Sequence, residues 1–162
     1  MKTLNLASRK ISTDFPAFVM GIVNCTPDSF FSGSRGGAER AFELIGEGAD
    51  ILDLGGESTR PGSDYVSAEE EIKRIVPVIE KIRRKSDIPI SVDTRKKSVM
   101  QAAFNSGADI LNDISALEDE PDLAFFAAEK KIPVILMHKR GIPSTMQADT
   151  EYKNIFNEVS SY

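Results

Sequence analysis

Polar side chains that can bind ligands follow five apolar runs of the chain, each at the point where the run ends. They are Asn24, the stretch from Glu57 to Arg60, Asp93, Asn112 with Asp113, and His138. Carboxylates and amides can recognise a heterocycle that presents N–H donors and ring acceptors, and a guanidinium can bind a phosphate or a carboxylate. Each residue taken alone could instead cap a helix or form a turn. Five such groups together favour one shared site.

The first polar stretch reads Asn24-Cys25-Thr26-Pro27-Asp28-Ser29-Phe30. Asn24 offers a neutral oxygen of the kind that Mg²⁺ accepts while it keeps several waters. Asp28 could reach such a metal through water or hold a neighbouring loop, and Phe30 could cover a flat ligand. The alternative is an ordinary Asx or proline turn with the phenylalanine packed into the core.

The second stretch, GGESTRPGS from Gly55 to Ser63, is longer than a plain turn requires. Arg60 is the strongest candidate for binding an anion, because a guanidinium matches carboxylate and phosphate geometry. Thr59 could donate a hydrogen bond to a phosphate oxygen. The structural alternative is an ion pair between Glu57 and Arg60.

Asp93 and Asn112 each end an apolar run, and together they could face a heterocycle. The alternative for Asp93 is that it caps the next helix. His138 is the only histidine and Cys25 the only cysteine, so the two cannot form a zinc site of the usual kind. A hydrogen-bonding role for His138 is favoured over a general base, and Cys25 is interpreted as a small apolar filler.

The apolar runs alternate with helical patterns along the whole chain. The runs cover residues 18–23, 51–54, 88–92, 110–111 and 133–137, and the helical patterns cover 38–47, 67–85, 96–106, 121–131 and a stretch that begins near 150. Ser67 and Glu70 form a capping box, Pro77 predicts a kink or a break, and Thr94 is the predicted N-cap of the third helix.

This alternation predicts parallel strands covered by helices, in either a doubly wound sheet or a (β/α)₈ barrel. The sequence Gly48 to Asp53 is echoed by Gly107 to Asn112, where a helix-ending glycine leads into a buried strand. In both architectures the carboxyl ends of the strands share one rim, and that rim holds the site.

Composition restricts the classes of partner. The chain has 162 residues, enough for one domain, and its net charge of −5 and pI near 5.0 argue against binding to nucleic acid or to an anionic membrane. No apolar run approaches the roughly 20 residues of a membrane span, and the N-terminus lacks a signal-peptide core. With one cysteine, no intrachain disulfide can form. A cytoplasmic location is expected.

Five motifs resemble those of the dihydropteroate synthase family. They are Asn24-x-Thr26-Pro27-Asp28-Ser29-Phe30, Gly55-Gly56-Glu57-Ser58-Thr59-Arg60-Pro61-Gly62, Ser91-Val92-Asp93-Thr94, Asn112-Asp113-Ile114-Ser115, and Leu136-Met137-His138 with Met146-Gln147. Each motif by itself is moderately specific. Their common order, at five predicted strand ends, makes the resemblance highly specific over about residues 18–147.

The resemblance implies one pterin-binding (β/α)₈ barrel domain over residues 1–162, with an N-terminal hairpin at about residues 3–14. It implies folate biosynthesis, in which 4-aminobenzoate displaces diphosphate from 6-hydroxymethyl-7,8-dihydropterin diphosphate to give 7,8-dihydropteroate. It further implies Mg²⁺ as the cofactor, small-molecule substrates rather than nucleic acid or membrane partners, a homodimer, and sulfonamides as ligands of the aminobenzoate site.

The resemblance also implies roles for single residues. Asn24 resembles the residue that binds Mg²⁺ and diphosphate, Thr59 resembles a diphosphate ligand, and Ser58 resembles a substrate-binding residue. Asp93 and Asn112 resemble pterin-recognising residues, and Phe30 and Pro61 resemble residues that line the aminobenzoate site. Asp28 and Arg60 resemble catalytic residues of the loops that fold over the substrates. One departure lies in the first loop, which usually continues Ser-Phe-Ser-Asp-Gly-Gly but here reads SFFSGS from Ser29 to Ser34.

A second departure is length. A complete barrel needs about 250 residues, so the resemblance covers about its amino-terminal 60%, and the chain stops inside the expected fifth helix. It lacks the later pterin-binding Asp, the Lys-x-Gly strand and the Arg-x-His that binds diphosphate. We therefore expect a truncated portion that is inactive by itself.

Two other functions stay open. A folate–corrinoid methyltransferase shares the barrel but should lack the Ser-Thr-Arg-Pro-Gly and Thr-Pro-Asp-Ser-Phe loops. A non-catalytic pterin-binding domain would be consistent with the absence of the second part of the barrel.

Overall fold

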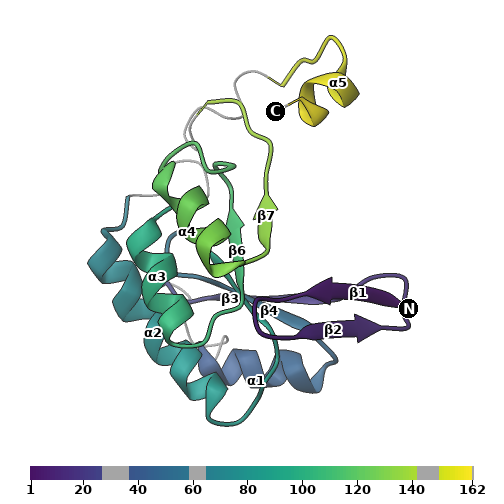
Figure 1. Ribbon diagram of the computed structural model, residues 1–162. Helices are drawn as coiled ribbons and strands as arrows, with labels where there is room; N and C mark the ends of the chain where they lie inside the picture. Colours follow the sequence, from purple (N-terminus) through teal and green to yellow (C-terminus); the bar gives the residue numbers. More distant parts are fainter. Residues whose placement is uncertain (27–36, 59–64, 142–149, 162) are drawn as a thin grey trace.

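The computed structural model describes residues 1–26, 37–58, 65–141 and 150–161. Its centre is a parallel sheet in the order β3-β4-β5-β6-β7, with helices on one face (Figure 1). The strands are β3 (Met20–Asn24), β4 (Ile51–Gly55), β5 (Ile90–Asp93), β6 (Ile110–Asp113) and β7 (Val134–Leu136), and the helices between them are α1 (Ala38–Gly46), α2 (Ala68–Arg83), α3 (Lys97–Asn105) and α4 (Asp122–Lys130). The expected alternation is confirmed, with each neighbouring pair of strands joined by a helix on the same side.

The main core lies between the sheet and these helices. Along α2, Ile75, Ile79 and Ile82 are fully buried, at the spacing of one helix face. They pack against the outer face of the sheet, where Leu52 and Leu54 of β4 are also fully buried. Burying one such side chain contributes about 1.5 to 3 kcal/mol, so this layer holds the strands in place.

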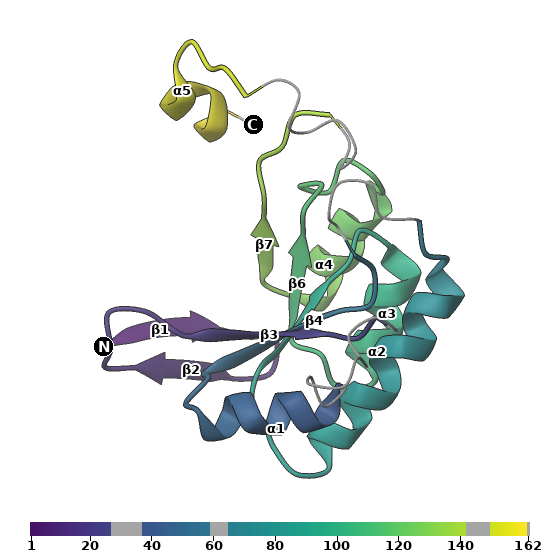
Figure 2. The ribbon, with the colours of Figure 1, turned by 180° about the vertical axis from the view of Figure 1, so that it is seen from behind.

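A hairpin covers the opposite end of the sheet from the rim. Strands β1 (Lys2–Asn5) and β2 (Lys10–Thr13) pair antiparallel, close to the predicted hairpin, and Figure 2 shows them projecting from the foot of β3. Leu6 packs with Ile51 and Ile110 at the amino ends of β4 and β6. The inner face of the sheet is therefore filled at this end by apolar side chains.

One local prediction is wrong and another is narrowed. Of the kink or break predicted at Pro77, the break is excluded, because helix α2 runs through this residue; proline removes one backbone donor, but the buried isoleucines on either side hold the helix on the sheet. Thr94 is not the N-cap of α3, because the helix starts three residues later, at Lys97. The side chain of Thr94 instead accepts from Lys96 N at 3.2 Å, and Glu120 Oε2 accepts from Lys97 N at 2.7 Å.

Other local predictions are confirmed in whole or in part. The Ser67 side chain accepts from Glu70 N at 3.3 Å at the start of α2. Gly48 and Gly107, the two echoed glycines, have φ of 98° and 109°, which favour glycine over other residues. The last helix, α5 (Ile155–Ser160), begins later than the expected start near residue 150. None of the helices in the described residues is long and apolar enough to cross a membrane.

Candidate functional site

The site begins with a row of residues that crosses four strands. The register pairs Asn24 of β3 with Gly55 of β4, Gly55 with Asp93 of β5, and Asp93 with Asn112 of β6. All four lie at the carboxyl ends of their strands. Because side chains alternate between the faces of a sheet, the row points to the inner face, away from the helices.

Asp53 lies one step deeper on the same face, and the sequence did not single it out. Its Oδ2 accepts a hydrogen bond from Asn112 Nδ2 at 3.1 Å, and the residue is only 7% exposed. This bond turns the amide oxygen of Asn112 away from Asp53. The available signal was a carboxylate inside an otherwise apolar strand, since buried charges are rare unless they have a partner.

Asp93 is half-buried and has an unusual pKa. Burial raises the pKa of its carboxyl from 3.8 to about 7, and the nearby carboxylates of Asp53, Glu71 and Asp113 add to the rise, while Arg95 opposes it. Among the described residues, the Oδ1 atoms of Asp93 and Asp53 and the Ser91 hydroxyl are buried without a hydrogen-bond partner. Buried acceptors without donors are costly, so this part of the inner face is suited to a ligand that carries N–H groups.

Asp113, the residue after Asn112, forms hydrogen bonds within the chain. It is fully buried and accepts from Ser115 N at 2.7 Å, from the Ser115 hydroxyl at 3.0 Å and from Leu117 N at 2.8 Å. These bonds shape the turn after β6. Asn112 therefore lies on the inner face of the sheet, whereas Asp113 stabilises the turn after β6.

Charged groups behind the row connect neighbouring loops. Lys96 Nζ lies 2.6 Å from Glu57 Oε2 and 2.7 Å from Glu71 Oε2. Arg95 pairs with Asp119 at 2.6 Å and reaches Glu57 at 3.4 Å. Burial alone would raise the pKa of Glu57, but hydrogen bonds from Lys96 and from Val66 N, together with the two cations, lower it.

Several predicted site residues lie outside the described residues. They are Asp28, Phe30, Thr59, Arg60 and Pro61, together with Met146 and Gln147. The predicted pairing of Glu57 with Arg60 lies there too. The described residues next to the first two polar stretches are in contact at the rim, because Cys25 N donates to Gly55 O at 2.8 Å. Ser58 is the last described residue of the second stretch before residue 65.

His138 contacts an aromatic side chain, whereas Cys25 is buried in the core. His138 Nδ1 lies 3.4 Å from the Tyr152 hydroxyl, and the Arg140 guanidinium stacks 3.9 Å from the centre of the Tyr152 ring. These contacts fit the favoured hydrogen-bonding role of His138. Cys25 is 2% exposed, and burial raises the pKa of its thiol to about 12, in agreement with an inert filler.

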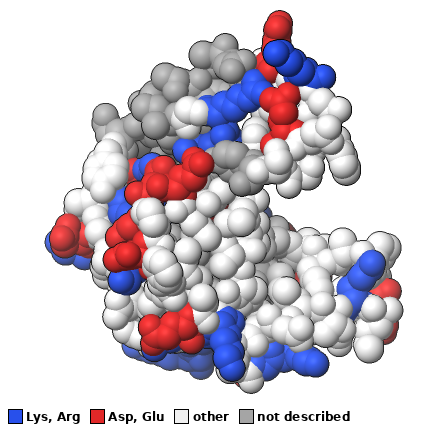
Figure 3. All heavy atoms as spheres, turned by 45° about the horizontal axis from the view of Figure 1, so that its top comes forward, with Lys and Arg blue, Asp and Glu red and all other residues white. Residues whose placement is uncertain are grey.

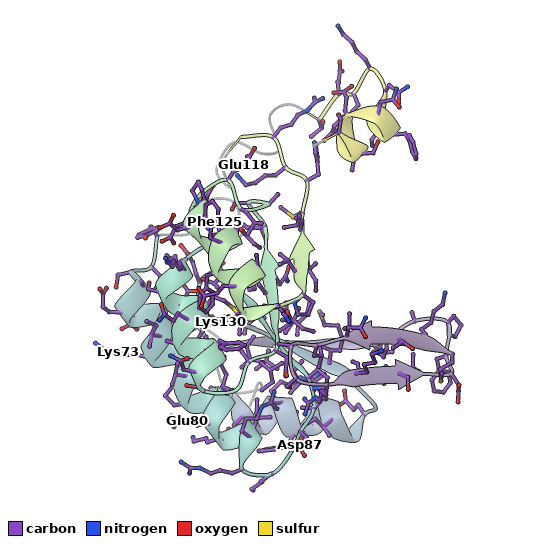
Figure 4. All side chains as sticks on the ribbon, in the orientation of Figure 1. Lys73, Glu80, Asp87, Glu118, Phe125 and Lys130 are labelled. Carbon is purple, nitrogen blue, oxygen red and sulfur yellow. The ribbon has the colours of Figure 1, made fainter. Side chains whose placement is uncertain are left out.

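The outer side of the helical layer carries charged side chains. In Figure 4, Lys73 and Glu80 of α2 and Lys130 of α4 project from the helical layer into solvent. Figure 3 shows the molecule hollowed between the α5 segment and the hairpin, with mostly uncharged surface around the hollow. Within the described sheet, β3 and β7 are edges, and Ile22, Ile135 and Leu136 are exposed.

Comparisons with known proteins agree on one family. The profile of the family described as "Pterin binding enzyme" matches residues 20–162. The dihydropteroate synthase of Synechocystis sp. is 44% identical over 150 residues, covering 90% of this chain and 52% of that protein. The Escherichia coli enzyme of the same name is 46% identical over 149 residues, covering 89% and 52%.

Solved structures give the same result. A Yersinia pestis dihydropteroate synthase with a sulfonamide drug complex has a TM-score of 0.87 and 37% identity, covering 99% of this chain and 59% of that one. The Thermus thermophilus enzyme in complex with 4-aminobenzoate has a TM-score of 0.83 and 38% identity, covering 99% and 58%. This chain spans about half the length of the curated relatives it matches.

The described sheet and helices are thus part of a (β/α)₈ barrel, and the doubly wound alternative is set aside. The family match extends over most of the chain, from β3 to the end. By its motifs, its fold and its relatives, this chain belongs to the pterin binding enzyme family.

Proposed function

We propose that this chain forms the pterin-binding rim of a dihydropteroate synthase. The protein would condense 6-hydroxymethyl-7,8-dihydropterin diphosphate with 4-aminobenzoate and release diphosphate. The observation that carries the proposal is a pair of buried carboxylate oxygens near Asn112, Asp53 Oδ1 and Asp93 Oδ1, which accept no hydrogen bond from any of the described residues. A pterin ring presents adjacent N–H donors and ring acceptors, which this set of groups complements.

Each residue of the row has a defined task in this proposal. Asp93 accepts from the N–H groups of the pyrimidine half of the pterin. Asn112 presents its amide oxygen and keeps its orientation through the 3.1 Å bond to Asp53. Because N–H donors favour the charged carboxylate, bound pterin would lower the pKa of Asp93 from its raised value of about 7.

The reaction needs positioning more than a nucleophile from the protein. The C–O bond between the pterin methylene and the diphosphate breaks, the arylamine nitrogen forms a bond to that carbon, and the amine loses a proton. The electron-rich pterin stabilises the developing charge on the methylene carbon. The chain would bind the pterin ring in one orientation and place the leaving diphosphate at the rim.

The residues at the rim fit Mg²⁺ bound together with diphosphate. Asn24 is exposed at the end of β3 and offers one neutral oxygen. Among the described residues, no group of three or more His, Cys, Asp or Glu could hold a metal, so diphosphate oxygens and water would supply the other ligands. When bound, Mg²⁺ would neutralise charge on the leaving diphosphate.

The remaining assignments stay part of the proposal. Ser58 and Thr59 would bind the diphosphate, Phe30 and Pro61 would line the aminobenzoate site, Asp28 and Arg60 would act from the loops over the substrates, and the protein would work in the cytoplasm as a homodimer. A single buried cysteine and the acidic net charge are compatible with that compartment.

Calorimetric titration of the chain with the pterin diphosphate, with and without Mg²⁺ and 4-aminobenzoate, tests the proposal. We expect binding that Mg²⁺ strengthens. We also expect Asp93→Asn to weaken it by about 100-fold, the value of a charge-assisted hydrogen-bond set of about 3 kcal/mol. Asp122→Asn, on the exposed end of α4, is the control.

Equal affinity of wild type and Asp93→Asn would contradict the proposal. Pterin binding that ignores both Mg²⁺ and aminobenzoate would instead favour the methyltransferase or the non-catalytic domain. Turnover is measured in parallel, because the chain covers only about half of its relatives.

A further inference from the structure

A fully buried serine lies on the inner face of the sheet, one step deeper than the row of strand-end residues. Ser91 stands two residues before Asp93 on β5, so the two side chains point to the same face. The register pairs Ser91 with Asp53 on β4 and with Ile110 on β6. Ser91 is therefore the direct neighbour of Asp53 and lies below Asp93.

Three buried polar atoms of these side chains have no hydrogen-bond partner within the described part of the chain. They are the Ser91 hydroxyl, Asp53 Oδ1 and Asp93 Oδ1. Neighbouring strands lie about 4.8 Å apart, and residues two apart on one strand lie about 6.6 Å apart. The Asp93 side chain leans toward β4, since its Oδ2 is 3.8 Å from the position of a Cβ at Gly55. One small molecule between the three side chains can therefore reach all of them.

Apolar side chains flank Asp53 and Ser91 within the described sheet. Ile22 is the register neighbour of Asp53 on β3, and Ile110 is that of Ser91 on β6. One step deeper, Ile51 belongs to the apolar cluster that also includes side chains of the hairpin. Buried polar atoms nearly always bind either protein or ordered water. A polar molecule is therefore expected beside these atoms.

Water suits this set of atoms better than a metal ion or the ring of the ligand. A water molecule can donate to both carboxylate oxygens and accept from the Ser91 hydroxyl, which gives the three hydrogen bonds typical of buried water. Within the described ranges, no group of three or more His, Cys, Asp or Glu could hold a metal. A ring bound by Asp93 and Asn112 would lie at the level of the row, above the fully buried Ser91.

We propose that Ser91 binds one buried water molecule together with Asp53 and Asp93, and that it acts through this water as a positioning residue for the Asp93 carboxylate. Both oxygens of Asp53 are then satisfied, because Oδ2 already accepts from Asn112 at 3.1 Å. Each carboxylate oxygen can accept more than one hydrogen bond, so Asp93 still accepts from the N–H groups of the ligand. The identity of that ligand rests on the proposed function, whereas the water site does not.

The first test is structural and uses two variants of matched shape. Ser91→Thr keeps the hydroxyl, and Ser91→Val replaces it with a methyl group. In crystal structures of the ligand-free chain we expect an ordered water within hydrogen-bond distance of both carboxylates in wild type and in Ser91→Thr, and none in Ser91→Val. A direct hydrogen bond from Ser91 to either carboxylate, without water, would overturn the proposal. An unchanged water in Ser91→Val would also contradict it.

The second test measures affinity for the pterin diphosphate by calorimetry in the same proteins. We expect Ser91→Thr to bind like wild type and Ser91→Val to bind about tenfold more weakly, because the Asp93 carboxylate loses the water that orients it. If the two larger side chains prevent folding, Ser91→Ala is compared with wild type instead. Ile90→Val is the control, since it removes one methyl group from the outer face of the same strand and should leave affinity unchanged.

The outcomes separate a positioning role from a purely structural one. Equal affinities of Ser91→Thr and Ser91→Val would refute the role of Ser91. An equal loss in Ile90→Val would show that affinity follows the packing of β5 in general, and it would refute that role as well. Absence of binding in wild type would refute the proposed function, while the crystal structures would still decide whether the water site exists.

Discussion

Replacing Asp93 with asparagine should stabilise the folded chain at alkaline pH and leave its stability nearly unchanged in acid. Folding raises the pKa of this carboxyl from 3.8 to about 7, first through burial and then through the neighbouring acids Asp53, Glu71 and Asp113. The folded state therefore binds the proton more tightly than the unfolded state. Asparagine has a similar shape and carries no charge, so it removes the penalty of ionising this position.

The sign and size of this change in the free energy of unfolding follow from the linkage between proton binding and folding. Below about pH 4 both states hold the proton and there is no penalty. Between pH 4 and 7 the unfolded state has lost its proton while the folded state keeps it, so stability falls as pH rises, and above pH 7 the loss is complete. A rise of the pKa from 3.8 to about 7 at ~1.36 kcal/mol per pKa unit gives about 4 kcal/mol, and solvent screening at the partly exposed side chain lowers the expected range to about 2 to 4 kcal/mol.

Urea unfolding of wild type and Asp93→Asn at intervals from pH 4 to pH 8 measures this difference. We expect the free energies of unfolding to agree near pH 4 and to separate by about 2 to 4 kcal/mol at pH 8, with the variant more stable. Asp122→Asn, at an exposed carboxyl of α4, should show no such divergence. A difference that stays constant across the series would refute the idea that burial and neighbouring acids perturb Asp93.

Three further predictions concern other parts of the molecule. Asp53→Ala should weaken pterin binding by about tenfold in calorimetry, because Asn112 loses the partner that orients its amide; unchanged affinity would remove Asp53 from the site. Ile79→Ala should cost about 2 to 5 kcal/mol of unfolding free energy, measured in urea, because the side chain is fully buried under the sheet, and a loss below about 1 kcal/mol would mean that this core is loosely packed. Cys25 should resist a thiol reagent at pH 8 until urea unfolds the chain, since burial raises the pKa of the thiol to about 12; rapid labelling of the folded protein would contradict its placement.

The alternation of strands and helices could be predicted because parallel strands covered on both faces read as continuous apolar runs. Ile51 to Leu54 is such a run, and it forms most of β4. The rim position of Asn24, Asp93 and Asn112 followed from one rule, that parallel strands end on the same side. The register now places these residues in one row.

Contacts between residues far apart in the chain could not be predicted. Lys96 meets Glu57 across 39 residues and Glu71 across 25, and neither spacing has a local signature. Asp53 was missed because it looked like an interruption of an apolar strand. Local patterns favour Thr94 as an N-cap, but Glu120, from a different turn, accepts the hydrogen bond from Lys97 N at the start of α3.

The side-by-side pairing of Asp93 with Asn112 makes ligand recognition depend on strand register. If the register of β6 shifted by one residue, Asp113 would take the place of Asn112 on the inner face. The Asn112 amide would then face the apolar core beneath the helices, and a third carboxylate would lie near Asp53 and Asp93. Under the proposed function, a chain with the shifted register would lack the amide that pairs with the pterin ring. Pterin affinity would then also report whether the strands of the sheet are correctly aligned.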